Sequence, residues 1–450
     1  MSVHMTESEI YGDVWGTEAM KNLFDDEPRT REWCRLIGVL AKAQAACDII
    51  PDNAAEEIYQ VCKSPSLSMD RLKEGYRETG HSMLGLIKLL EEQCDGDAGE
   101  WIYYGTTVQD ITDTWLMITL TEVHSIVQND LESIIDQLLD LTQQHRDTPM
   151  LGRTHGQAGS PITFGFKTAV WVDEMARHLD RLNEMKSRLS TGQLGGAVGG
   201  LTAYGEDGQQ LRREFFGRLE VSAPDIAWIN ARDRIVEFFQ TLTLIVSSIE
   251  KIGREVYNLQ RTEIDELAEG LASDAVGSIT MPHKKNPELS EHLGTLSRLV
   301  RSQVNTLTEN LIHDHERDGR SWKIEWEAIP SACMAAGTAL QLGADLLEDL
   351  TVKERSMQQN IDDLEGYPHS ERLMIRLARE VGKQTAHEIV YELARTAQKG
   401  STSFESLVRN DDRILDPLST GTLDSIFNGP GGLEQVHAAV DRVLREHDRL

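Results

Sequence analysis

Residues 116–141 read LMITLTEVHSIVQNDLESIIDQLLDL. Apolar side chains recur here at steps of three or four residues, at Leu116, Leu120, Val123, Val127, Leu131, Ile134, Leu138 and Leu141. This spacing places all of them on one face of an α-helix, because a helix turns once every 3.6 residues. The stretch therefore predicts one long amphipathic helix that Pro149 ends.

Stripes with the same spacing follow along the chain. One runs from Val172 to Leu189 and another from Ile235 to Leu259. Two more are expected after Pro287 and Pro330, with each proline near a helix start, where its missing N–H costs little. Helices of this length are too long for one small domain to cover, so we expect an extended bundle that other subunits complete.

The fold class predicted from these patterns is all-α, with three helical domains. Strand patterns are weak, and the six glycines of residues 192–205 predict a loop. A chain of 450 residues exceeds one core. We place an N-terminal helical domain at 1–114, a central long-helix bundle at 115–361 and a C-terminal helical domain at 362–450. The turn signal Gly366-Tyr367-Pro368 marks the last boundary.

The charge of the chain limits its partners. Its 74 acidic and 45 basic residues give a formal net charge of −29. Such a chain repels phosphate backbones, which argues against a nucleic-acid partner. The acids are spread along the sequence, which indicates a solvated surface. Adaptation to high salt is a second interpretation that the charge leaves open.

Targeting and cysteine patterns favour a reduced, cytoplasmic protein. No run of apolar residues is long enough for a transmembrane helix, and residues 1–9 lack the basic and apolar segments of a signal peptide, so we expect no membrane partner. Five cysteines occur without a CxxC pair, which disfavours a zinc site and a disulfide framework. We expect buried, reduced thiols.

The segment richest in chemistry is residues 277–287, GSITMPHKKNP. Gly277 permits unusual backbone angles beside Ser278. Lys284 and Asn286 lie just before the helix start at Pro287, where the helix dipole favours an anion. A serine on a loop beside a cation and a carboxamide fits chemistry on a carboxylate. The structural alternative is an ordinary turn and helix cap.

Three further segments carry polar groups. Residues 152–158 read GRTHGQA and are followed by PITFG at 161–165, residues 104–114 read YGTTVQDITDT, and residues 79–84 read TGHSML. Each has a structural alternative as well. A lone histidine such as His155 or His81 is more often structural than catalytic, and Asp110 and Thr112 are good capping residues for a helix start.

Together these segments resemble the signatures of the fumarase/aspartase superfamily, and the resemblance spans nearly the whole chain. Residues 277–287 are similar to its GSSxMPxKxNP motif, with Ile279 in place of the second serine. Residues 152–157 match the GRTHGQ stretch of the branch that holds adenylosuccinate lyase and 3-carboxy-cis,cis-muconate cycloisomerase. Residues 105–114 resemble its GATSQDxxDT stretch, with Val108 in place of the serine.

The resemblance implies an anti β-elimination or addition next to a carboxylate. Ser278 would be the catalytic base. His155, oriented by Glu291, would handle the proton at the leaving-group side. Lys284 and Asn286 would hold the developing charge.

The resemblance also implies the remaining substrate contacts and the assembly. Thr107 and Gln109 would bind a substrate carboxylate, Arg153 and Thr154 would contribute from the GRTHGQ motif, and His81 would line the pocket. The expected substrate is a small polycarboxylate, with no metal and no organic cofactor. The expected assembly is a homotetramer in which each site is shared by three subunits.

Two segments bear on the choice of substrate. Adenylosuccinate lyases carry ERDxxxSSxER where this chain reads ERDGRSWKIEW, and the serine and last arginine of that motif hold a phosphate. Here Trp322 or Lys323 lies near the serine position and Trp326 replaces the arginine, so a bidentate phosphate donor is lost. Residues 228–233, WINARD, resemble the WHxxRD of the cycloisomerase group, with Ile229 in place of histidine.

We therefore expect an enzyme most like 3-carboxy-cis,cis-muconate cycloisomerase. Arg232 is a candidate carboxylate ligand, with a surface arginine at a helix start as the alternative. Adenylosuccinate lyase, or another fumarate-releasing C–N lyase on an N-succinyl substrate, is the second interpretation. The polar-to-apolar changes at Val108, Ile229 and Ile279 leave another succinyl adduct open. A scaffold relative without catalysis is a lesser alternative.

Overall fold

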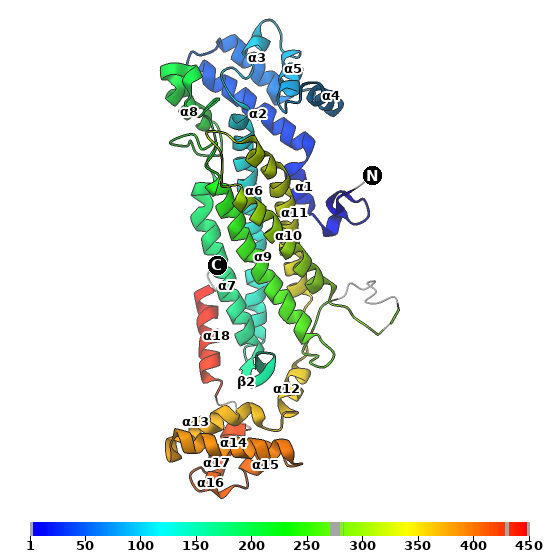
Figure 1. The fold of residues 1–450 in the computed structure, drawn as a ribbon, viewed down its shortest axis with the longest axis vertical. Helices are drawn as coiled ribbons and strands as arrows, with labels where there is room; N and C mark the ends of the chain where they lie inside the picture. The colour runs from blue at the N-terminus through cyan, green and yellow to red at the C-terminus, as the bar shows by residue number, and fades with distance from the viewer. Residues whose placement is uncertain (1–2, 271–279, 282, 428–431, 448–450) are drawn as a thin grey trace. The chain divides into compact units, whose positions relative to one another are not determined.

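The computed structural model describes residues 3–270, 280–281, 283–427 and 432–447. This part of the chain is mainly helical, as Figure 1 shows. It also contains two small antiparallel sheets, β1–β2 and β3–β4. The expected helical class is confirmed. The chain divides into two compact units. The first comprises Met1–Asp130, His178–Ser247 and Thr295–Gln341, and the second comprises Leu131–Arg177, Ser248–Gly294 and Leu342–Leu450.

The helices and strands have the following bounds. The α-helices are α1 (Glu18–Phe24), α2 (Asp26–Ala45), α3 (Asp52–Lys63), α4 (Met69–Thr79), α5 (Leu84–Glu91), α6 (Val108–Gln144), α7 (Phe164–Leu189), α8 (Gly208–Phe216), α9 (Asp233–Leu259), α10 (Glu288–Glu309), α11 (Gly319–Glu348), α12 (Glu354–Asp362), α13 (Ser370–Val381), α14 (Lys383–Lys399), α15 (Phe404–Val408), α16 (Asp412–Leu415), α17 (Thr420–Phe427) and α18 (Glu434–His447). The 3₁₀ helices are η1 (Met5–Glu7), η2 (Gly12–Val14), η3 (Ala98–Trp101), η4 (Thr202–Asp207) and η5 (Tyr367–His369). The strands are β1 (Pro149–Thr154), β2 (Gln157–Thr163), β3 (Leu267–Ala268) and β4 (Thr351–Val352).

The long helices follow the apolar stripes. The stripe of residues 116–141 lies within α6, and Leu120, Val123 and Leu131 on it are fully buried. The stripes of residues 172–189 and 235–259 lie within α7 and α9. Burial of these stripes stabilises the helices more than intrinsic propensity does, so the sequence spacing predicted them correctly.

The two prolines expected near helix starts behave differently. Pro287 directly precedes α10, as predicted. The placement of Pro330 was wrong, because it lies inside α11. An interior proline removes one backbone hydrogen bond, but the apolar face continues through it, and Ile329 and Ala332 are almost fully buried. Packing of that face outweighs the local signal to stop the helix.

A core forms around the N-terminal helices of the first unit. Helix α2 packs against α3, and α4 packs against α5. Buried side chains of these helices, such as Leu40 and Ile58, share one cluster with Leu211 and Phe215 of α8. The N-terminal core therefore includes residues from beyond the boundary expected at residue 114. The three-domain division stays a prediction.

The C-terminal helices of the second unit form a separate cluster. Leu373 of α13, Ile389 of α14, Phe404 of α15 and Leu423 of α17 pack together. The turn expected at residues 366–368 is present, with Gly366 at φ 93° leading into η5.

Among the described residues there is neither a candidate membrane-spanning helix nor a disulfide. No helix in the described ranges combines the length and apolar character needed to cross a bilayer. The five cysteines are unpaired, and all except Cys94 are buried. Burial raises the pKa of the Cys34 thiol to about 12, which keeps that thiol protonated and unreactive.

We predict that Gly192→Ala destabilises the first unit. A Cβ at Gly192 would lie 2.2 Å from the Phe216 ring, and the Gly192 carbonyl accepts a hydrogen bond of 2.7 Å from the Trp228 indole. Overpacking of this kind lowers the free energy of unfolding by about 1–3 kcal/mol. Gly319→Ala is the matched control, because nothing lies within 4 Å of its Cβ position. Equal urea unfolding midpoints for the two variants would contradict the prediction.

Candidate functional site

The N-terminus of α6 is held by the carboxylate of Asp110. One oxygen accepts the Thr107 N–H at 3.0 Å and the Thr106 hydroxyl at 2.9 Å. The carboxylate also accepts the N–H groups of Gly195 at 2.7 Å and Gly196 at 2.9 Å. The capping alternative is therefore confirmed for Asp110, which also anchors the glycine-rich loop, whereas the Thr112 hydroxyl donates to the Val108 carbonyl at 3.1 Å.

Thr114 fixes the same loop one turn further along α6. Its hydroxyl donates to the Gln193 carbonyl at 2.8 Å and accepts the Gln193 N–H at 3.0 Å. The Gln193 side chain in turn accepts the Trp228 N–H at 2.9 Å. Burial raises the pKa of Asp110, while its hydrogen bonds act in the opposite direction.

The predicted substrate contacts of this segment differ in exposure. Gln109 is almost fully buried, and its amide donates to Asp113 at 3.2 Å. Its carbonyl oxygen has no partner within the described ranges. Thr107 is half-buried at the helix start. The amide N–H of Gln109 thus serves the protein itself, and its role toward substrate stays a prediction.

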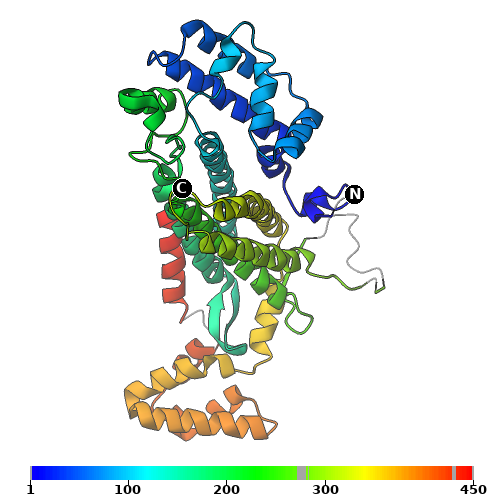
Figure 2. The ribbon, with the colours of Figure 1, turned by 45° about the horizontal axis from the view of Figure 1, so that its top comes forward.

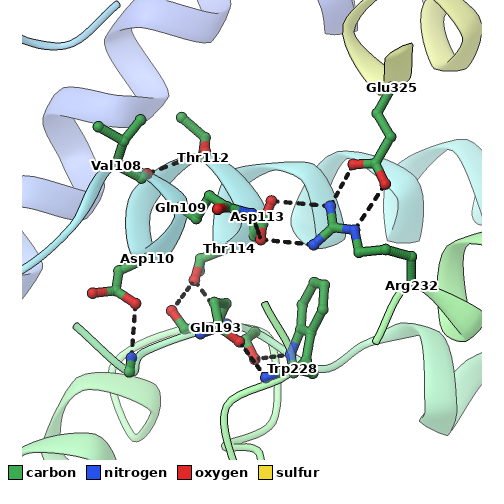
Figure 3. A network of polar contacts seen from close by, with 12 residues as sticks. Val108, Gln109, Asp110, Thr112, Asp113, Thr114, Gln193, Trp228, Arg232 and Glu325 are labelled. Atoms are coloured by element: carbon green, nitrogen blue, oxygen red, sulfur yellow. Dashed lines mark hydrogen bonds and ion pairs between the residues drawn. The ribbon is translucent and has the colours of Figure 1, made fainter. Parts of the chain in front are cut away.

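Arg232 is the centre of the polar network in Figure 3. Its guanidinium donates to both oxygens of Asp113, at 2.8 and 3.1 Å. It also donates to both oxygens of Glu325, and the hydrogen bond from Nε to Oε1 is 2.8 Å long. The Trp228 ring lies 5.0 Å from the guanidinium carbon. Two bidentate ion pairs on one arginine give directional as well as electrostatic fixation.

This network carries more negative than positive charge. Arg232, Asp113 and Glu325 are each at most 3% exposed, and Asn310 adds one neutral donor to Glu325 at 3.1 Å. Burial raises the pKa of Glu325 above its ordinary value, and the negative charge of Asp113 acts in the same direction, whereas Arg232 acts to lower it. Burial acts to lower the pKa of Arg232, but the two carboxylates have the larger effect, so this pKa is raised above its ordinary value.

The outcome for Arg232 has two parts. The alternative of a surface arginine was wrong, because only 1% of the residue is exposed. The carboxylates that it binds in this structure belong to the protein, and its role as a substrate ligand stays a prediction. Sequence reasoning missed Asp113 and Glu325, although both stand inside the quoted motifs and Asp113 lies four residues after Gln109.

A cavity of about 640 Å³ adjoins this network within the first unit. His81 lines it, and Trp322 and Trp326 line it too, with their ring centroids 4.9 Å apart in an edge-to-face contact. The charged residues on its wall are Asp26, Arg29, Asp70, Lys73, Asp113 and Glu325. The wall is therefore aromatic with an excess of acids.

Local structure orients the His81 ring. Its Nδ1 accepts the backbone N–H groups of Met83 at 3.3 Å and Leu84 at 3.2 Å, at the start of α5. An Nδ1 that accepts carries no proton in the neutral ring, so the proton resides on Nε2. The capping contact thus leaves Nε2–H as the donor of His81.

The second unit carries the GRTHGQ segment as a β-hairpin, drawn as paired arrows in Figure 2. Strand β1 pairs with β2, and Thr154 faces Gln157. His155 and Gly156 form the two-residue turn with φ of 54° and 74°. Tight hairpin turns of this kind need positive φ at both positions, which glycine adopts readily and histidine only with strain. The hairpin was not expected, because the histidine does not resemble a usual turn residue.

The turn exposes His155 and Thr154, whereas Arg153 points back into the protein. Its guanidinium binds both oxygens of Glu266, at 2.9 and 2.6 Å. Glu266 is fully buried and also accepts a hydrogen bond of 2.8 Å from Asn360. Arg153 therefore holds the hairpin in place, and its role as a substrate contact stays a prediction.

The end of the GSITMPHKKNP segment is fixed at the start of α10. The carboxylate of Glu269 accepts the N–H groups of Leu289 at 3.0 Å and Ser290 at 2.9 Å. The negative charge at this helix start is thus supplied by the protein's own Glu269. Sequence reasoning missed this residue. Lys284 and Asn286 directly precede the helix and are exposed or half-buried.

Of the three expected catalytic residues, His155 and Glu291 lie within the described ranges. Ser278 and Ile279 lie outside the described residues. The His155 ring makes no hydrogen bond to any residue in the described ranges, so its pairing with Glu291, in the first turn of α10, is not made there. The roles of Ser278, His155 and Glu291 stay predictions. No three His, Cys, Asp or Glu side chains among the described residues could together hold a metal ion.

Comparisons with known proteins agree along the whole chain. A family model described as "Lyase" matches residues 6–302, and one described as "Adenylosuccinate lyase C-terminus" matches residues 366–443. An N-acetyl-S-(2-succino)cysteine lyase of Dickeya dadantii is 35% identical, covering 100% of this chain and 98% of that protein. Its namesake in Enterococcus italicus is 37% identical, covering 94% and 93%.

A solved structure is similar over the same extent. The 3-carboxy-cis,cis-muconate lactonizing enzyme of Pseudomonas putida superposes with a TM-score of 0.91 at 28% identity. The superposition covers 98% of this chain and 99% of that one.

We predict that Arg232→Met strongly destabilises the protein. The variant leaves the carboxylates of Asp113 and Glu325 buried without a cation, which costs about 3–5 kcal/mol. Arg188→Met is the matched control, because Arg188 pairs with Glu237 on an exposed face, and such pairs contribute little. Urea unfolding of both variants measures the difference, and a loss for Arg232→Met no larger than that of the control would contradict the prediction.

Proposed function

We propose a function on one premise: the chain belongs to the fumarase/aspartase superfamily and is an enzyme of its lyase type. The proposed reaction is β-elimination from a succinyl thioether, with release of fumarate and a thiol. Related succinyl adducts with other small leaving groups fall within the proposal. Lyases of this family act on small carboxylate substrates.

The observation that carries the choice of leaving group is the tryptophan wall of the cavity. By the resemblance, Trp322 or Lys323 lies near the position of the phosphate-binding serine of adenylosuccinate lyases, and Trp326 replaces their arginine. Asp113 and Glu325 line the same cavity. A cavity lined by aromatic rings and carboxylates favours a neutral, apolar or sulfur-containing leaving group over a phosphate. The leaving group is therefore proposed to carry no phosphate.

The similar relatives support the same class. The two lyases from Dickeya dadantii and Enterococcus italicus are named for a thioether between succinate and N-acetylcysteine. They match this chain over nearly its full length. The differences from the family motifs at Val108, Ile229 and Ile279 are compatible with a succinyl adduct as the substrate.

The proposed mechanism begins with removal of a proton. Ser278 takes the proton from the methylene carbon next to a carboxylate, and the carbon's electron pair moves into that carboxylate. Lys284, Asn286 and backbone N–H groups hold the doubly charged species that forms. One preorganised donor of this kind commonly contributes roughly 10²–10³ in rate.

The second half of the reaction breaks the bond to the leaving group. The electron pair returns to form the carbon–carbon double bond of fumarate, and the carbon–sulfur bond breaks. His155, oriented by Glu291, gives its proton to the departing sulfur. Base and acid act from opposite sides, which gives anti elimination. The first unit would supply His81, Thr107 and Gln109 as substrate contacts.

The proposed assembly is a homotetramer with each site shared by three subunits. The exposed position of His155 on its turn supports this, because the ring has no hydrogen-bond partner within the described part of its own chain. An imidazole presented in this way is available to a neighbouring subunit. Sedimentation of the purified protein tests the tetramer.

A second candidate is the cycloisomerase reaction on 3-carboxy-cis,cis-muconate. The superposition on the lactonizing enzyme from Pseudomonas putida favours it. The two candidates differ in product, since one releases fumarate and the other forms a lactone without splitting the molecule. Incubation with S-(2-succino)cysteine, its N-acetyl form, adenylosuccinate and the muconate distinguishes them by chromatography. Release of fumarate from adenylosuccinate in preference to the thioethers would overturn the proposal.

We predict that Ser278→Ala lowers kcat by about 10²–10⁴, the usual contribution of a general acid or base. KM should change little, because the hydroxyl acts in the transition state rather than in binding. Ser187→Ala, on an exposed turn of α7, is the control with unchanged kcat. Fumarate absorbance follows the reaction, and near-normal turnover by Ser278→Ala would remove this residue as the base.

A further inference from the structure

The second unit contains a cavity that the proposed reaction does not use. Its volume is about 470 Å³, and it lies between strand β2, helix α13 and the end of α17. Ser160 of β2 and Thr422 of α17 line it together with Arg372, Arg376 and Arg379. None of these five residues has a role in the elimination proposed above.

The three arginines lie on one face of α13. They are spaced at i, i+4 and i+7, which aligns side chains along one side of a helix. With a rise of 1.5 Å per residue, Arg376 follows Arg372 by about 6 Å and Arg379 follows it by about 10 Å along the axis. The cavity is thus bordered by a row of guanidinium groups rather than by a single cation.

Arg376 and Arg379 lack the carboxylate partners that other arginines of this unit have. Arg146, Arg409 and Arg413 of the same unit each pair with two acids. By contrast, no ion pair joins Arg376 or Arg379 to any acid in the described ranges. In a chain of net charge −29, two neighbouring arginines without an ion pair among the described residues stand out.

The remaining polar groups on the wall offset this charge only in part, since one acid, Glu371, lines the cavity beside the three arginines. Arg372 donates to the Ile426 carbonyl at 3.4 Å. Backbone hydrogen bonds and the charge of Arg372 lower the pKa of Glu434, so this arginine has one acid nearby. The carboxylate of Glu371 accepts the Ser160 hydroxyl at 2.7 Å. Burial and the positive charge of Arg372 lower the pKa of His369 at the same cavity. The cavity therefore presents a positive potential in a polar, partly enclosed space.

We propose that this cavity is a binding site for a small multivalent anion, with two or more carboxylate or phosphate groups. Planar guanidinium groups bind both kinds of group bidentately. The spacing along α13 fits anionic groups several ångströms apart better than a single monovalent ion. The proposal is independent of which succinyl adduct the enzyme cleaves.

The position of the cavity links the anion to the catalytic hairpin. Ser160 and Pro161 belong to β2, and Pro161 pairs with Leu151 of β1. These strands carry the turn at His155. A bound anion would therefore rest against the hairpin and stabilise it, which gives the site the position of an effector site.

Calorimetric titration of the full-length protein tests the proposal. Citrate and inorganic pyrophosphate are the two probes, one with carboxylates and the other with phosphates. We expect the protein to bind at least one of them, and the tighter probe identifies the chemical class. Replacement of both free arginines, Arg376→Gln with Arg379→Gln, should weaken that binding at least about tenfold, because charge-assisted hydrogen bonds are lost.

The matched control removes the same charge from elsewhere in the unit. Arg395→Gln with Arg442→Gln changes two exposed arginines outside the cavity and should leave binding unchanged. If the double cavity variant is poorly folded, Arg379→Gln alone, at an exposed position, should still weaken binding. Absence of binding to both probes, or equal binding by the cavity and control variants, overturns the proposal. Neither result bears on fumarate release, which is measured separately.

Discussion

The structure of the first unit depends on one guanidinium, that of Arg232. It joins the start of α9 to Asp113 on α6 and Glu325 on α11. Because all three groups are shielded from water, none of the charges can be satisfied by solvent if a partner moves. Through Asp113 the interaction reaches Gln109 near the start of α6, and through Glu325 it reaches the wall of the tryptophan-lined cavity. The position of the cavity wall and the position of the motif segment are therefore fixed together.

The second unit uses the same principle at the hairpin. Glu266 is fully buried and is paired with Arg153 of β1. A shift of the strand that leads to His155 would break this ion pair and leave the Glu266 carboxylate buried without a cation. Glu269 fixes the start of α10 in a similar way. Acidic side chains of this chain are thus not only a solvated surface. Several are structural anchors for segments that carry the family motifs, while Arg376 and Arg379 on α13 make no ion pair with an acid among the described residues.

Agreement between sequence and structure depends on the range of the interactions involved. The long helices α6, α7 and α9 were predicted, because an amphipathic stripe is a local periodic signal that burial then stabilises. The hairpin at His155 was missed, because its turn lacks the usual residues and its pairing is decided by contacts between strands. Pro330 was misplaced, because packing along the apolar face of α11 outweighs the local effect of one proline.

The sequence by itself determined the helical class, the superfamily and the motif segments, since each is recorded in local spacing and residue type. It did not determine what those motif residues contact. Only the tertiary structure decided that Arg232 and Arg153 are bound to the protein's own carboxylates, that Glu269 caps α10 and that three arginines of α13 border a cavity. The physical reason is that ion pairing and burial depend on groups brought together from distant parts of the chain, and no local pattern records those partners.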